Sequence, residues 1–246
     1  MQMKKIEILL ISGFLLLSIL VGILIGYVLL PKSKDIYQNI SIEDPAVNYL
    51  YKMANPSDDV STLRTLYETE NFSNEYILAT AFVDFLKEHP NYTENISNEQ
   101  IDEYVKKIFG NISYTHTSGS VISEYLCSFT YDDTTQNYQI LIGCNGNFNE
   151  RILRKITSAK KSNNEYVLTE KSIVINDNFD KISEGEDTAI TIYNDVNHTK
   201  ELRRITYKDT APEISLDDYL KDAAVYEYHF EKENNRFIYK SFKRIN

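Results

Sequence analysis

The chain has 246 residues, of which 42% are hydrophobic and 12% aromatic, and its formal net charge is −10. A chain of this length and apolar content can bury a sizeable core, which excludes a protein that is disordered by composition. Its acidity disfavours nucleic acid as a partner, because the phosphate backbone is also negative. The small numbers of Gly (8) and Pro (5) exclude collagen-like and linker-like segments.

A transmembrane helix is predicted at residues 8–30, after a short N-terminal tail at residues 1–7. The 23 residues of this segment carry no charge, and a helix of that length crosses the hydrocarbon core of a bilayer. A cleaved signal peptide is the alternative. It fits less well, because the apolar run is long and small residues do not follow it at the −3 and −1 positions. The sequence therefore predicts an uncleaved single-pass anchor whose partner is the lipid bilayer.

The orientation of the anchor rests on a small charge difference. Two lysines precede the segment and two follow it, so the N-terminal amine tips the positive-inside balance. We expect the protein in the cell membrane, with the N-terminus inside and the remainder of the chain in an extracytoplasmic domain.

One face of the anchor carries small residues. Ser18, Gly22 and Gly26 recur every four residues, a spacing that lets two membrane helices approach closely. This pattern would allow a homodimer through the transmembrane helix. The interpretation we favour is incidental glycine, which is common in membrane helices.

Residues 31–113 have a helical pattern. Four N-cap residues, Asp44, Ser57, Ser73 and Ser97, each precede an apolar-periodic run. The last forms a capping box with Gln100, and Gly110 is expected to end that helix.

Residues 114–246 have a period of two, which predicts antiparallel strands. The strand-like runs include RILRKITSA, EYVLTEKSIVI, TAITIYN and LRRITY, and the chain ends in a hairpin pattern with Asn234-Asn235 at the turn. A short helix, SLDDYLKDA, is expected after Pro212. Helices followed by an antiparallel sheet predict an α+β fold, with both segments packed as one extracytoplasmic domain.

Charge is unevenly distributed along the chain. Residues 35–150 carry 18 acids and 5 bases, whereas residues 151–246 carry 17 of each. The bases of the second part cluster at Arg151, Arg154, Lys155, Lys160 and Lys161, and again at Lys200, Arg203 and Arg204. They could bind anions or lipid headgroups; the interpretation we favour is a solvated sheet face that also carries acids.

Catalytic and metal-binding signatures are weak. Four separated histidines lack zinc-site spacing, and Ser158 with Lys161 matches S-x-x-K without the companion motifs of acyl-transfer enzymes. Asn176, Asn178, Asp180, Glu184 and Asp187 have part of the spacing of a calcium loop, but Lys181 stands where Gly is needed. We expect no catalytic residues, no cofactor and no metal site.

The two cysteines suggest a disulfide. If Thr134 to Asn137 form the loop of a hairpin, Tyr131 faces Ile140, Phe129 faces Ile142, and Cys127 faces Cys144. Directly opposed cysteines can bridge, so the sequence predicts a Cys127–Cys144 disulfide outside the cytoplasm. Two reduced thiols are the alternative if the domain is cytosolic.

The stretches IDEYVKKIFGNISY and YEYHFEKENNRFIYKSFKRIN resemble segments of uncharacterised single-pass anchored extracytoplasmic proteins of low-GC Gram-positive bacteria. The order of tail, span, helices and curved antiparallel sheet also resembles NTF2-like assembly proteins of secretion machines. These resemblances imply location and fold and bring no catalytic residues.

The sequence thus favours a non-enzymatic, membrane-anchored domain that makes protein–protein contacts at the cell envelope. The alternative is a surface hydrolase or small-ligand-binding domain whose site assembles from residues distant in the chain.

Overall fold

The computed structural model describes residues 36–55, 72–92, 95–120, 126–142, 150–177, 188–208 and 210–246. The predicted transmembrane segment at residues 8–30, with Ser18, Gly22 and Gly26, lies outside these ranges, as does the predicted helix after Ser57. Among the described residues, no helix is long and apolar enough to cross a membrane. Tyr37–Asn246 form one compact unit.

Three predicted helices begin at their expected caps. They are α2 (Pro45–Ala54), α4 (Asn74–Glu88) and α5 (Asn98–Phe109). The capping box between Ser97 and Gln100 is confirmed in both directions, and Gly110 ends α5 with a positive φ of 69°, a conformation that favours glycine. An apolar-periodic run predicts one buried face, but ten of the fifteen residues of α4 are buried.

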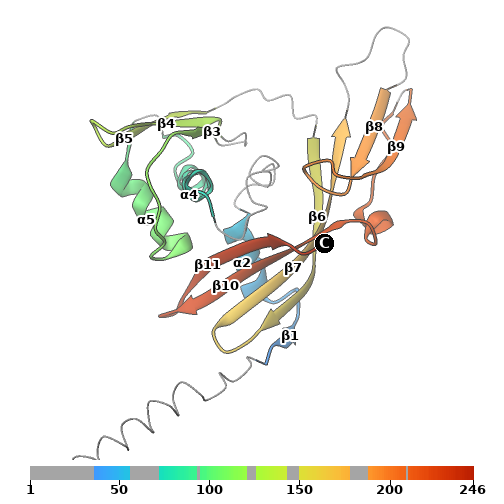
Figure 1. Ribbon diagram of the computed structural model, residues 1–246, viewed down its shortest axis with the longest axis horizontal. Coiled ribbons are helices and arrows are strands. Elements are labelled where there is room, and N and C mark those ends of the chain that lie inside the picture. The colour runs from blue at the N-terminus through green and yellow to red at the C-terminus, as the bar shows by residue number, and fades with distance from the viewer. Residues whose placement is uncertain are drawn as a thin grey trace, which may run out of the picture. The chain divides into compact units, whose positions relative to one another are not determined.

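A four-stranded antiparallel sheet lies beside α4 and α5 (Figure 1). Its strands, in spatial order, are β2 (Ile96–Ser97), β5 (Asn137–Leu141), β4 (Ser128–Asp132) and β3 (Gly119–Ser120). The β4–β5 hairpin falls where the period-two pattern predicts it.

The predicted register of that hairpin is wrong by two residues. Phe129 faces Ile140, and Tyr131 faces Tyr138. The loop is Asp133 to Gln136, one residue earlier than expected, because the Asp132 carboxylate accepts hydrogen bonds from the backbone N–H groups of Thr134 and Thr135. A shift of two residues keeps the same side chains on the buried face.

The second sheet has seven antiparallel strands. Its main path is β1 (Gln38–Ile40), β6 (Glu150–Lys161), β7 (Glu165–Asp177), β10 (Ala224–Glu233) and β11 (Arg236–Arg244), and β8 (Thr188–Tyr193) and β9 (Glu201–Tyr207) extend it. The β7 strand pairs with β6 along one edge; along the other edge its first half pairs with β10 and its second half with β8. Mixed helices and antiparallel sheets confirm the α+β class.

In the C-terminal part, the predicted turn is confirmed and the predicted short helix is only partly formed. Asn234 and Asn235 form the two-residue β10–β11 turn with positive φ angles of 46° and 68°, as hairpin turns of this length require. The helix predicted in SLDDYLKDA is shorter than expected, a single 3-10 turn, η2 (Leu216–Tyr219).

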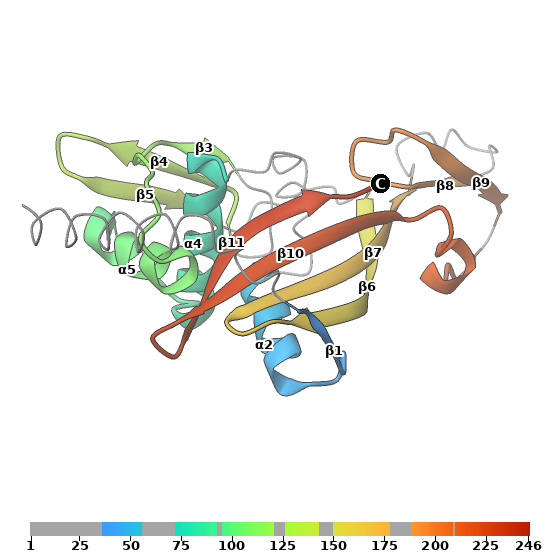
Figure 2. The same cartoon turned by 60° about the horizontal axis from the view of Figure 1, so that its bottom comes forward.

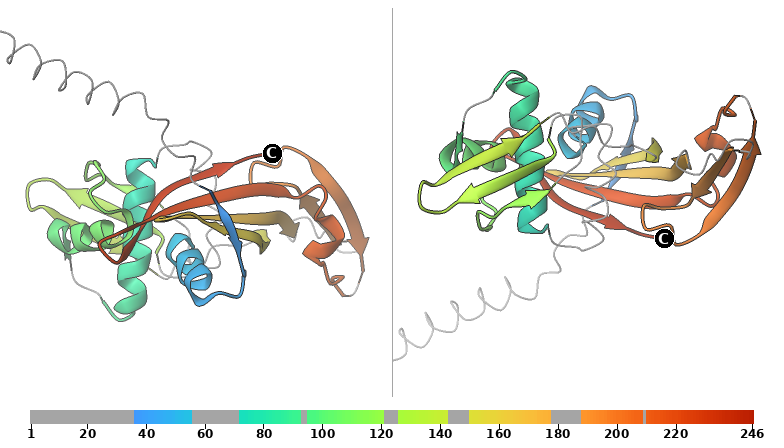
Figure 3. Two further views of the ribbon diagram at one scale, coloured as in Figure 1. Left: turned by 90° about the horizontal axis from the view of Figure 1, so that it is seen from below. Right: turned by 90° about the horizontal axis from the view of Figure 1, so that it is seen from above.

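Two hydrophobic cores lie on opposite faces of β7. Tyr166 and Leu168, in its first half, belong to a large core that includes the helices and the small sheet. Ile173 and Ile175, in its second half, pack with β8 and the η2 segment. Because successive strand residues alternate in direction, these even and odd positions face opposite sides. Figures 2 and 3 show α4 and α5 at one end of the large sheet and η2 with β8 and β9 at the other.

Candidate functional site: a groove between α2, α5 and the β10–β11 turn

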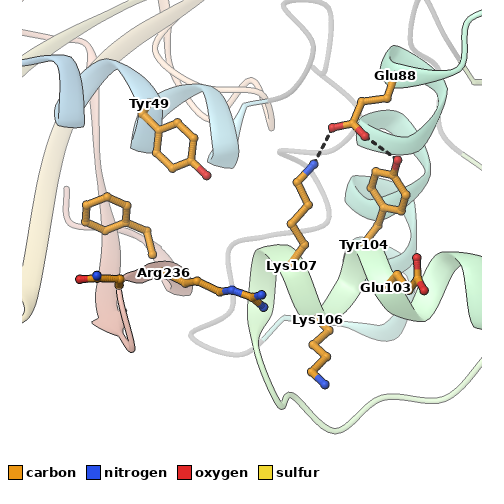
Figure 4. A pocket seen from close by; sticks show the side chains of 9 residues that line it. Tyr49, Glu88, Glu103, Tyr104, Lys106, Lys107 and Arg236 are labelled. Carbon is orange, nitrogen blue, oxygen red and sulfur yellow. Dashed lines mark hydrogen bonds and ion pairs between the residues drawn. The ribbon is translucent and has the colours of Figure 1, made fainter.

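A groove of about 900 Å³ is lined by residues from four elements that are far apart in sequence. Tyr49 comes from α2, Glu88 from the end of α4, and Arg236 and Phe237 from the start of β11 (Figure 4). The largest share comes from α5, which contributes Glu103, Tyr104, Lys106 and Lys107. An adjoining cavity of about 340 Å³ shares Tyr49, Glu88 and Lys107 with it. We call the two together the groove.

Local sequence features place these side chains. The capping box and Gly110 fix the limits of α5, so its exposed face, opposite Ile101 and Val105, is presented to the groove. The asparagine turn allows β11 to begin directly after β10, which brings Arg236 and Phe237 to the rim.

Lys107 is the centre of a polar cluster on one wall. Its ammonium donates hydrogen bonds to Asp84 at 2.8 Å and Glu88 at 2.7 Å, and the Tyr104 hydroxyl donates to Glu88 at 2.6 Å. Hydrogen bonds from Lys107 and Tyr104 hold the pKa of Glu88 below its ordinary value. Burial, together with the nearby Glu88 carboxylate, raises the pKa of Tyr104 to about 12.

This cluster acts as a structural ion-pair network rather than as a catalytic site. Burial disfavours the charged form of Lys107, but the hydrogen bonds to Asp84 and Glu88 outweigh it and raise its pKa. Both Glu88 and Lys107 are therefore held in their charged forms near neutral pH, and neither is poised to exchange a proton, as a general acid or base must.

The opposite wall is aromatic. Tyr49 is 52% exposed, and its ring centroid lies 5.9 Å from that of Phe237. The Phe237 ring also contacts Tyr166 at 5.2 Å in an edge-on arrangement. This side of the groove offers an apolar surface anchored to the sheet.

A second concave region, of about 420 Å³, includes Asp102, Tyr114 and His116. The His116 Nδ1 lies 2.6 Å from the Tyr138 hydroxyl, and Nε2 lies 3.2 Å from Asp102. Both ring nitrogens therefore have partners, and Tyr138 is fully buried. The arrangement ties the small sheet to α5 and leaves no ring nitrogen for a substrate.

The other sequence candidates are not assembled into a site. Ser158 and Lys161 lie on β6, where a spacing of three places them on opposite faces, and the Ser158 hydroxyl donates to Thr169. Asn176 lies in β7 and bonds Glu150, whereas residues 178–187 of the predicted calcium loop lie outside the described ranges. No group of His, Cys, Asp or Glu that could hold a metal ion occurs among the residues that the structure describes.

The basic clusters of the second half are interspersed with acids. Arg151 lies 3.7 Å from Asp177, Lys155 lies 3.0 Å from Asp217, and Lys200 lies 2.7 Å from Asp222. These contacts agree with a solvated sheet face of mixed charge.

Only one of the two cysteines of the predicted disulfide lies within the described ranges. Cys127 is buried, and no free cysteine occurs among the described residues. Cys144 lies outside the described ranges. The observed β4–β5 register, which pairs Ser128 with Leu141, differs from the register that predicted the pairing of the two cysteines. The bridge stays a prediction.

The groove could not be predicted from the sequence. Its residues belong to segments around positions 49, 88, 105 and 236, and no motif connects them. The sequence carries one signal for the groove: residues 35–150 contain only five bases, four of which are lysines.

Comparison with protein-family models, with curated proteins and with solved structures gives no match.

Proposed function

We propose that the chain is a single-pass membrane protein, anchored by residues 8–30 with its N-terminus inside, whose extracytoplasmic domain binds a partner protein through the groove. The groove carries this proposal: it combines an aromatic wall, formed by exposed Tyr49 and half-buried Phe237, with charged side chains at its rim. Aromatic residues and arginine are the types enriched at protein–protein contact sites.

The same geometry disfavours the hydrolase alternative. A pair of carboxylates shares a proton when the two face each other without a counter-ion, but Asp84 and Glu88 are bridged by the Lys107 ammonium. We therefore propose that the domain is a binding module without turnover.

An NTF2-like arrangement is a finer proposal for the fold. Its support is the long antiparallel sheet formed by β6, β7, β10 and β11, with helices packed over one face (Figure 3). The additional small sheet and the β8–β9 extension are departures from a single curved sheet. By fold analogy alone, this arrangement favours a role in an envelope assembly.

The test is photo-crosslinking in intact cells that make the full-length chain. A photoreactive phenylalanine analogue at Tyr49 is expected to form an adduct with a second protein, because the side chain is exposed at the groove. The same analogue at Thr206, which is exposed on β9, serves as the control and should not give that adduct. Identical adducts at both positions, or none at Tyr49, would contradict the proposal.

We also propose the Cys127–Cys144 disulfide, which the extracytoplasmic location would favour. Non-reducing mass spectrometry of alkylated protein is expected to find a peptide linking the two cysteines. Closing this loop should stabilise the domain by about 3 kcal/mol on the chain-entropy model. Complete alkylation of both thiols in protein prepared without reductant would remove the bridge and weaken the proposed topology.

A further inference from the structure

The bases of the N-terminal half of the domain are concentrated at the groove. Residues 35–150 carry 18 acids but only five bases. All four lysines of this stretch, Lys52, Lys87, Lys106 and Lys107, line the groove; Arg64 lies outside the described ranges. The β10–β11 turn adds Arg236 to the same rim. The groove is thus a cationic region within a half-domain of net charge −13.

Several of these cations are available to a ligand. Lys107 is already neutralised by Asp84 and Glu88. Lys52, Lys106 and Arg236 are exposed and form no ion pair within the described part of the chain. Figure 4 shows Arg236 directed from the turn toward the α5 wall. Among the lining acids, Glu103 alone is not bonded to Lys107, so three cations face an incoming ligand against one carboxylate.

Apolar surface lies between the cations. Tyr49 and Phe237 form the aromatic wall, and Met53 and Ile108 line the adjoining cavity. A ligand that fills the groove must therefore offer negative charges and apolar side chains a few ångströms apart. A polypeptide with acidic and apolar residues in alternation has that chemistry. Lipid headgroups and anionic polysaccharides supply the charge without the apolar side chains.

We propose that the groove binds an acidic, apolar-containing segment of a partner protein, with carboxylates at Lys106 and Arg236 and apolar side chains against Tyr49 and Phe237. This inference rests on the proposed contact function and specifies the class of partner. Charge complementarity between groove and segment would speed association and reject basic segments.

The experiment measures binding of fluorescent peptides to the full-length chain in nanodiscs of zwitterionic lipid. The probe peptide alternates Asp and Phe, and the comparison peptides replace Asp by Ser or by Lys. We expect the Asp peptide to bind most tightly. The double variant Lys106→Glu/Arg236→Glu should weaken its binding about tenfold or more, because attraction becomes repulsion at two contact points.

The matched control is Arg203→Glu/Arg204→Glu, which makes the same change of charge on exposed residues of β9. We expect it to alter binding by no more than about twofold, because the change lies beyond the screening length of the groove at physiological salt. Equal losses in the two double variants would mean a general charge effect and would overturn the inference.

Two further outcomes separate this inference from the proposed function. If polyphosphate or anionic lipid vesicles bind the groove while the Asp peptide does not, the ligand is not a protein segment, and the inference is wrong. If Tyr49 still crosslinks to a second protein but the Lys106→Glu/Arg236→Glu change does not reduce that adduct, the contact function stands and the acidic class of partner fails. Absence of any adduct specific to Tyr49 removes both.

Discussion

Replacing Arg244 by Met is expected to lower the free energy of unfolding at neutral pH by about 3–5 kcal/mol, the usual cost of removing one partner from a buried ion pair. The Arg244 Nη1 lies 2.7 Å from Asp195, whose side chain has no exposed surface. This pair joins the end of β11 to the loop after β8, and its loss leaves the Asp195 carboxylate buried without its cation.

The loss of unfolding free energy caused by Arg244→Met should depend on pH. Burial alone would raise the pKa of Asp195, but hydrogen bonds from Thr199 and the charge of Arg244 hold it below its ordinary value. A carboxylate with a lowered pKa in the folded state contributes stability above the pKa of the unfolded chain, and this stability is lost as the pH falls through the folded-state pKa. Removal of the Arg244 charge raises the pKa of Asp195 relative to the parent, so the difference in stability between variant and parent should shrink as the solution is acidified.

Urea unfolding of the full-length chain in detergent, followed by circular dichroism, would measure both effects. Lys200→Met is the matched control, because the Lys200–Asp222 pair is equally short but more than half exposed on both sides, and exposed pairs contribute roughly 0–1 kcal/mol. Equal costs for the two substitutions, or an Arg244→Met cost that does not change between neutral and acidic pH, would contradict the role given to the buried pair.

Phe82→Ala is expected to destabilise the domain by about 3–5 kcal/mol, because truncating a buried phenylalanine loses transfer free energy and leaves a cavity. Phe82 is fully buried in α4. Its ring stacks on Phe129 at 4.8 Å and meets Tyr138 edge-on at 4.8 Å, so it joins the central helix to the small sheet. The same denaturant titration would measure the loss.

Tyr49→Ala is the control for Phe82→Ala. It removes an aromatic ring that is half exposed, so it should cost much less stability, although it removes one of the two rings of the aromatic wall. A Phe82→Ala cost no greater than that of Tyr49→Ala would show that the small sheet is not held by this contact.

The sequence does not predict that Phe82 is buried whereas Tyr49 is exposed. Both lie in helices with an apolar period, and periodicity alone would bury each of them. The burial of each side chain depends on which elements pack against its helix. The α4 helix lies between the small sheet and the aromatic residues of β11, so ten of its residues are buried. The α2 helix has part of its surface at the groove.

For the β4–β5 hairpin, side-chain periodicity predicts the strands but not their register. Its existence and its buried face follow from the alternation of side chains, which any even register preserves. The register depends on the loop, and the Asp132 carboxylate closes that loop one residue earlier than the cysteine positions suggested. The hydrogen bonds of the Asp132 side chain thus determine the register, which periodicity does not specify.

The sequence by itself determined the caps of α2, α4 and α5 and the asparagine turn of the final hairpin, because these depend on residues within a few positions of one another. It did not indicate β1 and β2, which lie within the segment predicted as helical and form by pairing with the distant strands β6 and β5. Only the tertiary structure decided the two cores on opposite faces of β7 and the groove. Both require contacts between segments separated by up to almost two hundred residues, such as Tyr49 with Phe237. Neither local propensity nor hydrophobic period specifies which distant segments meet, so the cationic groove emerges only when α2, α5 and the β10–β11 turn pack together.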